Sequence, residues 1–260
     1  MVPVIPVGDW TFGRIDTVRA WRELTDARVN YSADEVRRPS WNIDTYRTVL
    51  PGERPGPPEP GGSWEHACRL VRDYQFSPPE IVRALYDPTT PLLGRDMLLE
   101  ARFHGMHFYC GVRITEVVDE TRDTTDRVWG WAYETLEGHL ERGKATYEVV
   151  KRQSTGQVQF VVSCYSQGAP TLDRITSLGW RLFGRRTQLR FYRRCGERLR
   201  GFVEAVLRDG HPGLGPPAGV GHLVCAPSDA RMRRLDALAI RRVAPGRATG
   251  RAADARPPAS

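Results

Sequence analysis

Between residues 95 and 165 the chain repeats one pattern five times, with apolar side chains at every second position and turn-forming residues between the repeats. Successive side chains of a β-strand point to opposite faces, so this pattern predicts strands with one apolar face and one wetter face. Short, polar connections between the repeats favour antiparallel neighbours. We therefore expect one antiparallel sheet with a single buried face. The five segments are 95–103, 106–118, 127–136, 144–151 and 157–165.

Helices and a further strand are expected before this sheet. Residues 41–50 are predicted to form a strand, and the Pro/Gly-rich residues 51–62 a loop, since they suit neither a helix nor a central strand. Residues 63–72 are predicted to be helical. A second short helix is predicted over 77–86, because its Ser-Pro-Pro-Glu start has the spacing of a capping box with proline at the first helical position.

The longest helical pattern covers residues 185–208, after a short helix predicted over 171–184. Its apolar positions recur every three or four residues, and arginines occupy most of the remaining surface. Gly210 and Pro212 are expected to end it. The apolar stripe consists of Leu189, Tyr192, Cys195, Leu199, Phe202, Val203 and Val206.

This order of elements predicts an α+β fold, in which a curved antiparallel sheet wraps around a long C-terminal helix. This is the helix-grip arrangement. One helix cannot fill the concave side of such a sheet completely, so we expect a cavity between the sheet and the helix.

We divide the chain into three regions. Residues 1–40 are an N-terminal extension with a short helix within 15–29, and residues 41–208 form the helix-grip domain. Residues 209–260 are a basic, partly disordered C-terminal extension, in which 228–243 are predicted to form a basic amphipathic helix.

The lengths of the apolar runs and the spacing of the cysteines both bear on where in the cell the protein is located. No run approaches the roughly 18 apolar residues that a membrane helix needs, and the first residues lack a positive stretch and a cleavage site for secretion. The five cysteines contain no Cys-x-x-Cys pair, which suits free thiols in a reducing environment. The sequence therefore predicts a cytoplasmic protein without membrane insertion.

The net charge of +7 is concentrated in the arginine-rich residues 181–208 and 227–260. A basic surface can attract nucleic acid or an anionic membrane. No zinc finger, basic zipper or RNP-type aromatic motif accompanies it, so solvated helix faces explain the charge more simply. The sequence thus disfavours a nucleic-acid partner.

One hairpin carries a motif that resembles a known family. The motif reads Tyr-x-Thr-Leu-x-Gly-His-x-Glu-x-Gly and is similar to that of the uncharacterised proteins called domain of unknown function nineteen-ninety. The resemblance covers about residues 41–208. The family's opening strand begins Asn-Tyr, and this chain departs from it by having Ile43 after Asn42. It implies a compact domain related to START and Bet v 1 helix-grip proteins, and it implies no reaction. The motif positions are Tyr133, Thr135, Leu136, Gly138, His139, Glu141 and Gly143.

Aromatic side chains on one strand face are the candidates for ligand binding. Trp129, Trp131 and Tyr133 alternate along residues 127–136, and tryptophan and tyrosine supply apolar area together with a polar tip. We predict that they grip an apolar or aromatic small molecule, together with Thr135 and Tyr147. The alternative is that they fill the core under the long helix.

His139 and Glu141 are the candidates for proton transfer. A histidine beside a carboxylate can act as a general base or acid, because its ordinary pKa of about 6.5 lies close to neutral pH. If the protein is an enzyme, these two residues would be catalytic, with Tyr133 as a hydrogen-bond donor. The alternative is a rigid hairpin, in which Gly138 and Gly143 allow unusual backbone angles while His139 and Glu141 cap unpaired backbone groups.

Cofactor motifs are missing from the sequence. His104, His107 and Cys110 have a metal-like spacing, but residues three apart on a strand face opposite sides, and a zinc site needs further close ligands. A phosphate-binding loop, a dinucleotide fingerprint at a strand–helix junction and a serine-hydrolase motif are all absent. We predict neither a metal nor a cofactor.

Three functions remain open at this point. The first is the binding of an apolar or aromatic small molecule between sheet and helix. The second is a cyclase, isomerase or dehydratase on the same scaffold, as in bacterial specialised metabolism, since the strong preference for arginine over lysine indicates a GC-rich bacterial genome. The third is a basic interaction module. The sequence identifies neither the ligand nor the oligomeric state, and it does not decide whether the protein is an enzyme.

Overall fold

The computed structural model describes residues 5–7, 10–13, 15–103, 106–123, 125–169, 185–229 and 238–242. Its helices are α1 (Thr17–Arg22), α2 (Ser63–Arg72) and α4 (Arg185–Asp209), with a single 3-10 turn at Ala33–Glu35. The strands of the central region are β3 (Asn42–Val49), β4 (Val82–Tyr86), β5 (Asp96–Phe103), β6 (Met106–Arg122), β7 (Asp126–Thr135), β8 (Glu141–Arg152) and β9 (Gln157–Gly168). Short strands at the two ends are β1 (Ile5–Val7), β2 (Trp10–Gly13), β10 (Ala218–Val220), β11 (Leu223–Ala226) and β12 (Leu238–Arg242).

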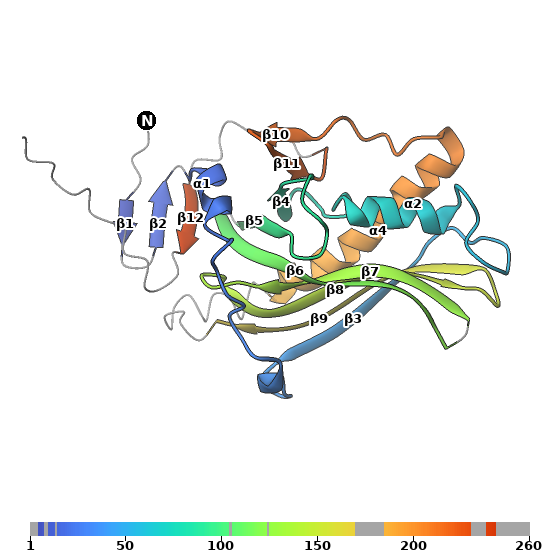
Figure 1. Cartoon of the computed structure of the whole chain (residues 1–260), viewed down its shortest axis with the longest axis horizontal. Coiled ribbons are helices and arrows are strands. Elements are labelled where there is room, and N and C mark those ends of the chain that lie inside the picture. Colours follow the sequence, from blue (N-terminus) through green and yellow to red (C-terminus); the bar gives the residue numbers. More distant parts are fainter. Residues whose placement is uncertain are drawn as a thin grey trace, which may run out of the picture.

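The described strands form one sheet with the order β10-β11-β4-β5-β6-β7-β8-β9-β3 (Figure 1). All neighbours along this path are antiparallel. The five segments with alternating apolar residues are β5 to β9, as predicted, and 41–50 contains the predicted strand β3. Strand β12 pairs in parallel with the start of β6 and antiparallel with β2, so segments before α1 and after β11 join the sheet.

The sheet curves, and α2 and α4 lie on its concave side (Figure 1). The register between β6 and β7 shifts between Ile114 and Glu116, and such a bulge bends the strand that carries it. Helix α4 packs against β3, β9 and α2. The predicted fold class is confirmed: an α+β fold in which a curved antiparallel sheet grips a long C-terminal helix.

Large aromatic side chains fill one end of the space between the sheet and the helices. Tyr74 and Phe76 follow α2 and pack against strands β7 to β9, with 4.6 Å between the ring centroids of Phe76 and Tyr147. The indole nitrogen of Trp131 donates a hydrogen bond to the Val71 carbonyl at 3.1 Å. We call this set the aromatic core cluster, and all its members are fully buried: Tyr74, Phe76, Trp131, Tyr147 and Phe160.

Helix α4 confirms the predicted long helix and ends where expected. Gly210 has φ 79°, and its N–H bonds to the Val206 carbonyl at 2.8 Å. The predicted stripe is wrong at Leu189, which is 48% exposed, whereas Phe191 is buried. A concave sheet covers more of the helix circumference than a flat one, so the buried stripe is wider than the spacing alone indicates.

The helix predicted over 77–86 is wrong, because this segment contains strand β4. The Ser77 hydroxyl donates to the Val82 carbonyl at 2.7 Å instead of capping a helix. Strand β4 lies between β5 and β11, and residues 83–86 are buried. Pairing on both edges satisfies the backbone and buries both faces, which outweighs the local capping pattern.

The two predicted extensions contain more strand than expected. The predicted C-terminal extension of residues 209–260 contains β10 and β11, and β12 occupies part of the helix predicted over 228–243. Helix α1 ends at Arg22 and is shorter than the pattern over 15–29. The chain from Val29 onward lies along the β7–β8 hairpin, with a bridge from Val29 to Leu136. The helix predicted over 171–184 and the tail after residue 242 lie outside the described residues.

A buried ion pair holds the Pro/Gly-rich loop to the sheet. Lys151 of β8 and Glu53 of the loop are 0% and 2% exposed, and their charged atoms lie 2.5 Å apart. Glu53 also accepts the backbone N–H of Trp64 at 2.7 Å, at the start of α2, and the Lys151 ammonium donates to the Pro57 carbonyl at 2.8 Å. One carboxylate therefore joins the loop, the helix and the sheet.

Among the described residues, no helix is long and apolar enough to cross a membrane.

We expect Lys151→Met to lower the free energy of unfolding by about 3–5 kcal/mol, because it leaves the Glu53 carboxylate buried without its cation. Lys144→Met is the matched control, since Lys144 lies on the same strand and pairs with the more exposed Glu116. It should cost at most about 1 kcal/mol. Urea unfolding of both variants measures the difference. Equal losses would contradict the importance assigned to the buried pair.

A second test concerns the contact between α4 and β3. A Cβ on Gly196 would lie 1.9 Å from the Thr48 hydroxyl oxygen, whereas one on Gly201 would meet nothing within 4 Å. Gly201→Ala should stabilise the protein by about 0.5–1 kcal/mol through helix propensity. Gly196→Ala should destabilise it by about 1–3 kcal/mol, because the overlap forces helix and strand apart. Thermal unfolding of both variants gives the two signs, and a stabilising Gly196→Ala would refute the close packing.

Candidate functional site

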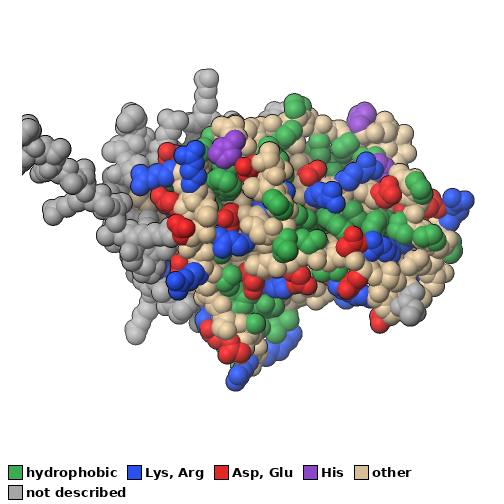
Figure 2. Space-filling model, in the orientation of Figure 1, with side chains coloured by type: hydrophobic (Ala, Val, Ile, Leu, Met, Phe, Trp, Pro, Cys, Tyr) green, Lys and Arg blue, Asp and Glu red, His purple; other side chains and the backbone are tan. Residues whose placement is uncertain are grey.

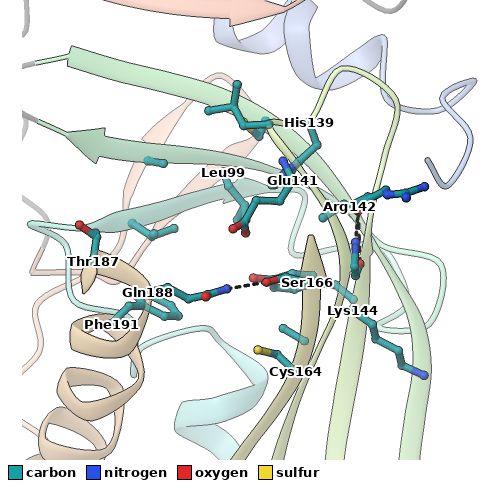
Figure 3. A pocket seen from close by; sticks show the side chains of 18 of the residues that line it. Leu99, His139, Glu141, Arg142, Lys144, Cys164, Ser166, Thr187, Gln188 and Phe191 are labelled. Carbon is teal, nitrogen blue, oxygen red and sulfur yellow. Dashed lines mark hydrogen bonds between the residues drawn. The ribbon is translucent and has the colours of Figure 1, made fainter. Parts of the chain in front are cut away.

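A pocket of about 150 Å³ lies between the concave face of the sheet and the first turns of α4 (Figure 3). The aromatic core cluster closes the pocket on one side, because Tyr147 is a member of that cluster and also lines the pocket. Across the pocket, the Gln188 side-chain amide of α4 donates to the Ser166 hydroxyl of β9 at 2.9 Å. The apolar part of its wall includes Leu99, Phe108, Cys110, Leu140, Ala145 and Phe191.

The alternation of β8 decides which of its side chains face the pocket. Ala145 and Tyr147 are buried, so Glu141, four and six residues before them in the same alternation, belongs to the same concave face. Arg142 and Lys144 border the pocket from the opposite face. The Arg142 guanidinium donates to Gln167 at 2.7 Å, and the Lys144 ammonium donates to Glu116 at 2.5 Å. Of Glu141, Arg142 and Lys144, only Glu141 is therefore on the face of β8 that is turned toward the pocket.

The motif hairpin is held together by its own side chains. The Thr135 hydroxyl accepts the Gly143 N–H at 2.9 Å and donates to the Asn30 amide oxygen at 2.6 Å. Gly138 and Gly143 have φ of 84° and 154°. A Cβ on Gly143 would lie 2.1 Å from the Tyr165 carbonyl oxygen, so no other residue fits there without moving β9. These contacts favour the rigid-hairpin interpretation of the motif.

His139 uses its ring to satisfy this hairpin. Its Nδ1 accepts the backbone N–H of Glu141 at 2.9 Å, so the contact runs to the backbone and not to the carboxylate. Burial lowers the pKa of His139 to about 4. The ring is therefore neutral near pH 7. A carboxylate that orients and charges the ring, as the acid–base hypothesis requires, is not part of this contact.

The thiols of the pocket are held in their protonated form. Burial raises the pKa of Cys110 to about 12 and that of Cys164 to about 12. The Cys164 sulfur lies 2.6 Å from the Tyr192 hydroxyl, and burial also raises the pKa of this tyrosine and of Tyr133. Because the thiolate is the nucleophile, neither thiol is prepared for covalent catalysis.

Three of the predicted ligand-binding residues line the pocket: Tyr133, Thr135 and Tyr147. Trp129 and Trp131 are not among the described lining residues. Trp131 is fully buried in the aromatic core cluster, and the guanidinium of Arg72 covers the Trp129 ring at 5.2 Å. The core-filling interpretation applies to these two tryptophans, because the side chains after α2 occupy the space in front of that part of β7. The catalytic roles assigned to His139, Glu141 and Tyr133 stay predictions, although all three residues border the pocket.

Several lining residues were missed at the sequence level. Ser166 continues the β9 alternation one step past the predicted end at residue 165, so extending the period would have found it. Phe191 and Gln188 lie outside the predicted stripe of α4, and only the wide grip of the sheet brings them to the pocket. No local signal marks these two positions.

No group of three or more His, Cys, Asp or Glu in the described part of the chain could hold a metal ion. His104 lies outside the described residues. His107 is buried and pairs with Glu100, with 2.5 Å between its Nδ1 and a carboxylate oxygen.

Most arginines of α4 have acidic neighbours. Arg185 pairs with Asp44, Arg198 with Asp229, and Arg200 with Glu204. Figure 2 shows positive and negative side chains interspersed over the visible face. The ion pairs of Arg185, Arg198 and Arg200 offset part of the positive charge of α4.

Comparisons with known proteins find one matching family and several solved structures. The family described as domain of unknown function (DUF1990) matches residues 25–198. An aromatase/cyclase from a Streptomyces species has a similar structure, with a TM-score of 0.40 and 12% identity over 65% of this chain and 96% of that one. A hypothetical protein from Helicobacter pylori matches with a TM-score of 0.36 and 13% identity, over 64% and 94% of the two chains. Ara h 8.0201 matches with a TM-score of 0.36 and 10% identity, over 61% and 97%. No curated protein matches the sequence.

The neutral state of His139 predicts a pH dependence of stability. Its pKa is about 4 in the folded protein and about 6.5 when unfolded, so stability is complete above pH 6.5 and falls as the pH drops toward 4. His139→Asn keeps an acceptor for the Glu141 N–H and removes the titration. Between pH 7.5 and pH 5 we expect wild type to lose about 1–2 kcal/mol more than this variant. Urea unfolding at the two pH values measures both losses, and identical losses would show that His139 is not buried in the neutral form.

Proposed function

The chain belongs to the DUF1990 family, and from its pocket we propose that it binds a small apolar or aromatic molecule between the sheet and α4. The observation that carries this proposal is the apolar space left where the aromatic core cluster ends. The wall there is built from residues of β5 to β9 and α4. We assign the binding unit to the helix-grip domain of residues 41–208, with the chain around Asn30 bracing the hairpin that forms one wall.

The size of the pocket sets the size of the guest. A cavity of about 150 Å³ with apolar walls holds a molecule of benzene size, so a single ring or a short branched chain fits without rearrangement. Burying about 200 Å² of guest surface yields about 5 kcal/mol before the costs of association. Because association costs reduce this gain, the expected affinity is millimolar or weaker.

Binding has more support than catalysis in this pocket. Its histidine is neutral and bonded to the backbone, and burial keeps its thiols protonated. The cyclase, isomerase or dehydratase hypothesis would need a different proton carrier. The cytoplasmic location remains a prediction, consistent with five free cysteines.

Filling the pocket tests the proposal. Ala145 lies on its wall, and the next residue, Thr146, lies on the opposite face of β8. We expect wild type to bind toluene or indole in ligand-observed NMR titrations, and Ala145→Phe to lose this binding because its ring occupies the space. Thr146→Phe, which adds the same ring outside the pocket, should bind like wild type.

Circular dichroism and thermal unfolding establish that each variant is folded before its binding is compared. Undiminished binding by a folded Ala145→Phe would refute the site. A wild-type protein that binds none of a panel of single-ring compounds would refute the proposed function.

A further inference from the structure

We propose that the guest carries a hydroxyl group on its ring, which the Tyr133 hydroxyl binds inside the pocket. This inference rests on the proposed function and deepens it by naming a chemical class: a small, neutral, hydroxylated aromatic molecule. It is carried by the position of Tyr133 beside a row of small side chains on the concave face of the sheet.

The strand register explains where the pocket opens. Tyr133 of β7 lies opposite Ala145 of β8, and Ala145 lies opposite Cys164 of β9, so these three side chains form one row on the same face. All three line the pocket. In the neighbouring row, Trp131 lies opposite Tyr147, and both rings belong to the aromatic core cluster. Because alanine and cysteine are much shorter than these rings, the open space begins at the row that contains Tyr133.

The Tyr133 hydroxyl lies at the boundary between the two rows. It forms a hydrogen bond with the Tyr147 hydroxyl, with 3.2 Å between the two oxygens. Tyr147 is fully buried, whereas Tyr133 keeps an accessible part. Of the two tyrosines, Tyr133 is therefore the one that a guest above Ala145 can reach.

The bonding capacity of Tyr133 favours a hydroxyl group on the guest. A tyrosine hydroxyl has one donor site and two acceptor sites, and its contact with Tyr147 uses one of them. Burial raises the pKa of both tyrosines, so both keep their protons near neutral pH. A guest hydroxyl can donate as well as accept, so it complements Tyr133 whichever tyrosine donates in the pair. A ketone or ether oxygen can only accept.

The other hydroxyl groups of the wall hold its elements together. The Thr135 hydroxyl is bonded within the motif hairpin. The Tyr192 hydroxyl lies 2.6 Å from the Cys164 sulfur, and the Ser166 hydroxyl accepts the Gln188 amide, so both contacts join β9 to α4. Strand β8 separates β9 from β7. A ring above β8 therefore reaches its polar partner on β7 without disturbing the contacts between β9 and the helix.

Phenol and toluene are probes of nearly equal size that differ in one hydroxyl group. A pocket without a polar partner would bind phenol at least about 10-fold more weakly than toluene, because the hydroxyl loses its hydrogen bonds to water. A hydrogen bond to Tyr133 offsets this loss. We therefore expect wild type at pH 7.5 to bind phenol at least as tightly as toluene in ligand-observed NMR titrations.

Removing the Tyr133 hydroxyl tests the assignment of this residue. Tyr133→Phe should weaken phenol binding at least about 10-fold and change toluene binding less than about 3-fold, because only phenol loses a hydrogen bond. Tyr86→Phe is the matched control. It also removes the hydroxyl of a buried tyrosine, one that donates to the Asp73 carbonyl at 3.2 Å and does not line the pocket. This control should bind both probes like wild type.

The outcomes distinguish this inference from the proposed function. If wild type binds toluene more tightly than phenol, or if a folded Tyr133→Phe keeps the wild-type ratio of the two affinities, the hydroxyl assignment is overturned while the pocket remains a binding site. If neither probe binds to wild type, the proposed function fails and this inference fails with it. The ranking of the two probes by wild type decides the question even if Tyr133→Phe does not fold.

Discussion

Covering the concave face of the β6–β9 sheet is the requirement on which the rest of this structure depends. Each of these strands places an apolar row on that face, and leaving the rows in water would cost more than any single hydrogen bond contributes. Helix α4 covers part of the face, and the chain after α2 supplies Tyr74 and Phe76 to cover another part. The two coverings do not meet everywhere, and the pocket lies where they separate.

The residues of the family motif have two different structural roles. Most of its residues hold the β7–β8 hairpin in one shape: Thr135 and His139 bond to backbone groups, and Gly143 allows β9 to approach closely. A hairpin fixed in this way presents Glu141 and Tyr133 to the pocket from a rigid wall. Asn30 braces the hairpin from outside, so a residue of the predicted N-terminal extension takes part in forming the site.

The differences between expectation and structure share one cause. Capping-box spacing at Ser77 is a local signal, and pairing of β4 with two neighbours overrides it. Trp129 and Trp131 alternate with Tyr133 along one strand, yet only the tyrosine borders the pocket, because what stands in front of each ring depends on the segment after α2. Leu189 follows helical spacing but is exposed, since the position of α4 within the sheet decides which side is covered.

From the sequence alone, the strand period of two, the long apolar stripe of α4 and the hairpin motif determined the fold class, the family and the neighbourhood of the site. These features depend on residues close together in the chain, so their spacing carries the information. Only the tertiary structure decided where the cavity lies, which aromatic rings fill the core and which way Glu141 points. Those properties depend on contacts between segments as far apart as Asn30 and Glu141, or Phe76 and Tyr147, and no local pattern encodes how such segments meet.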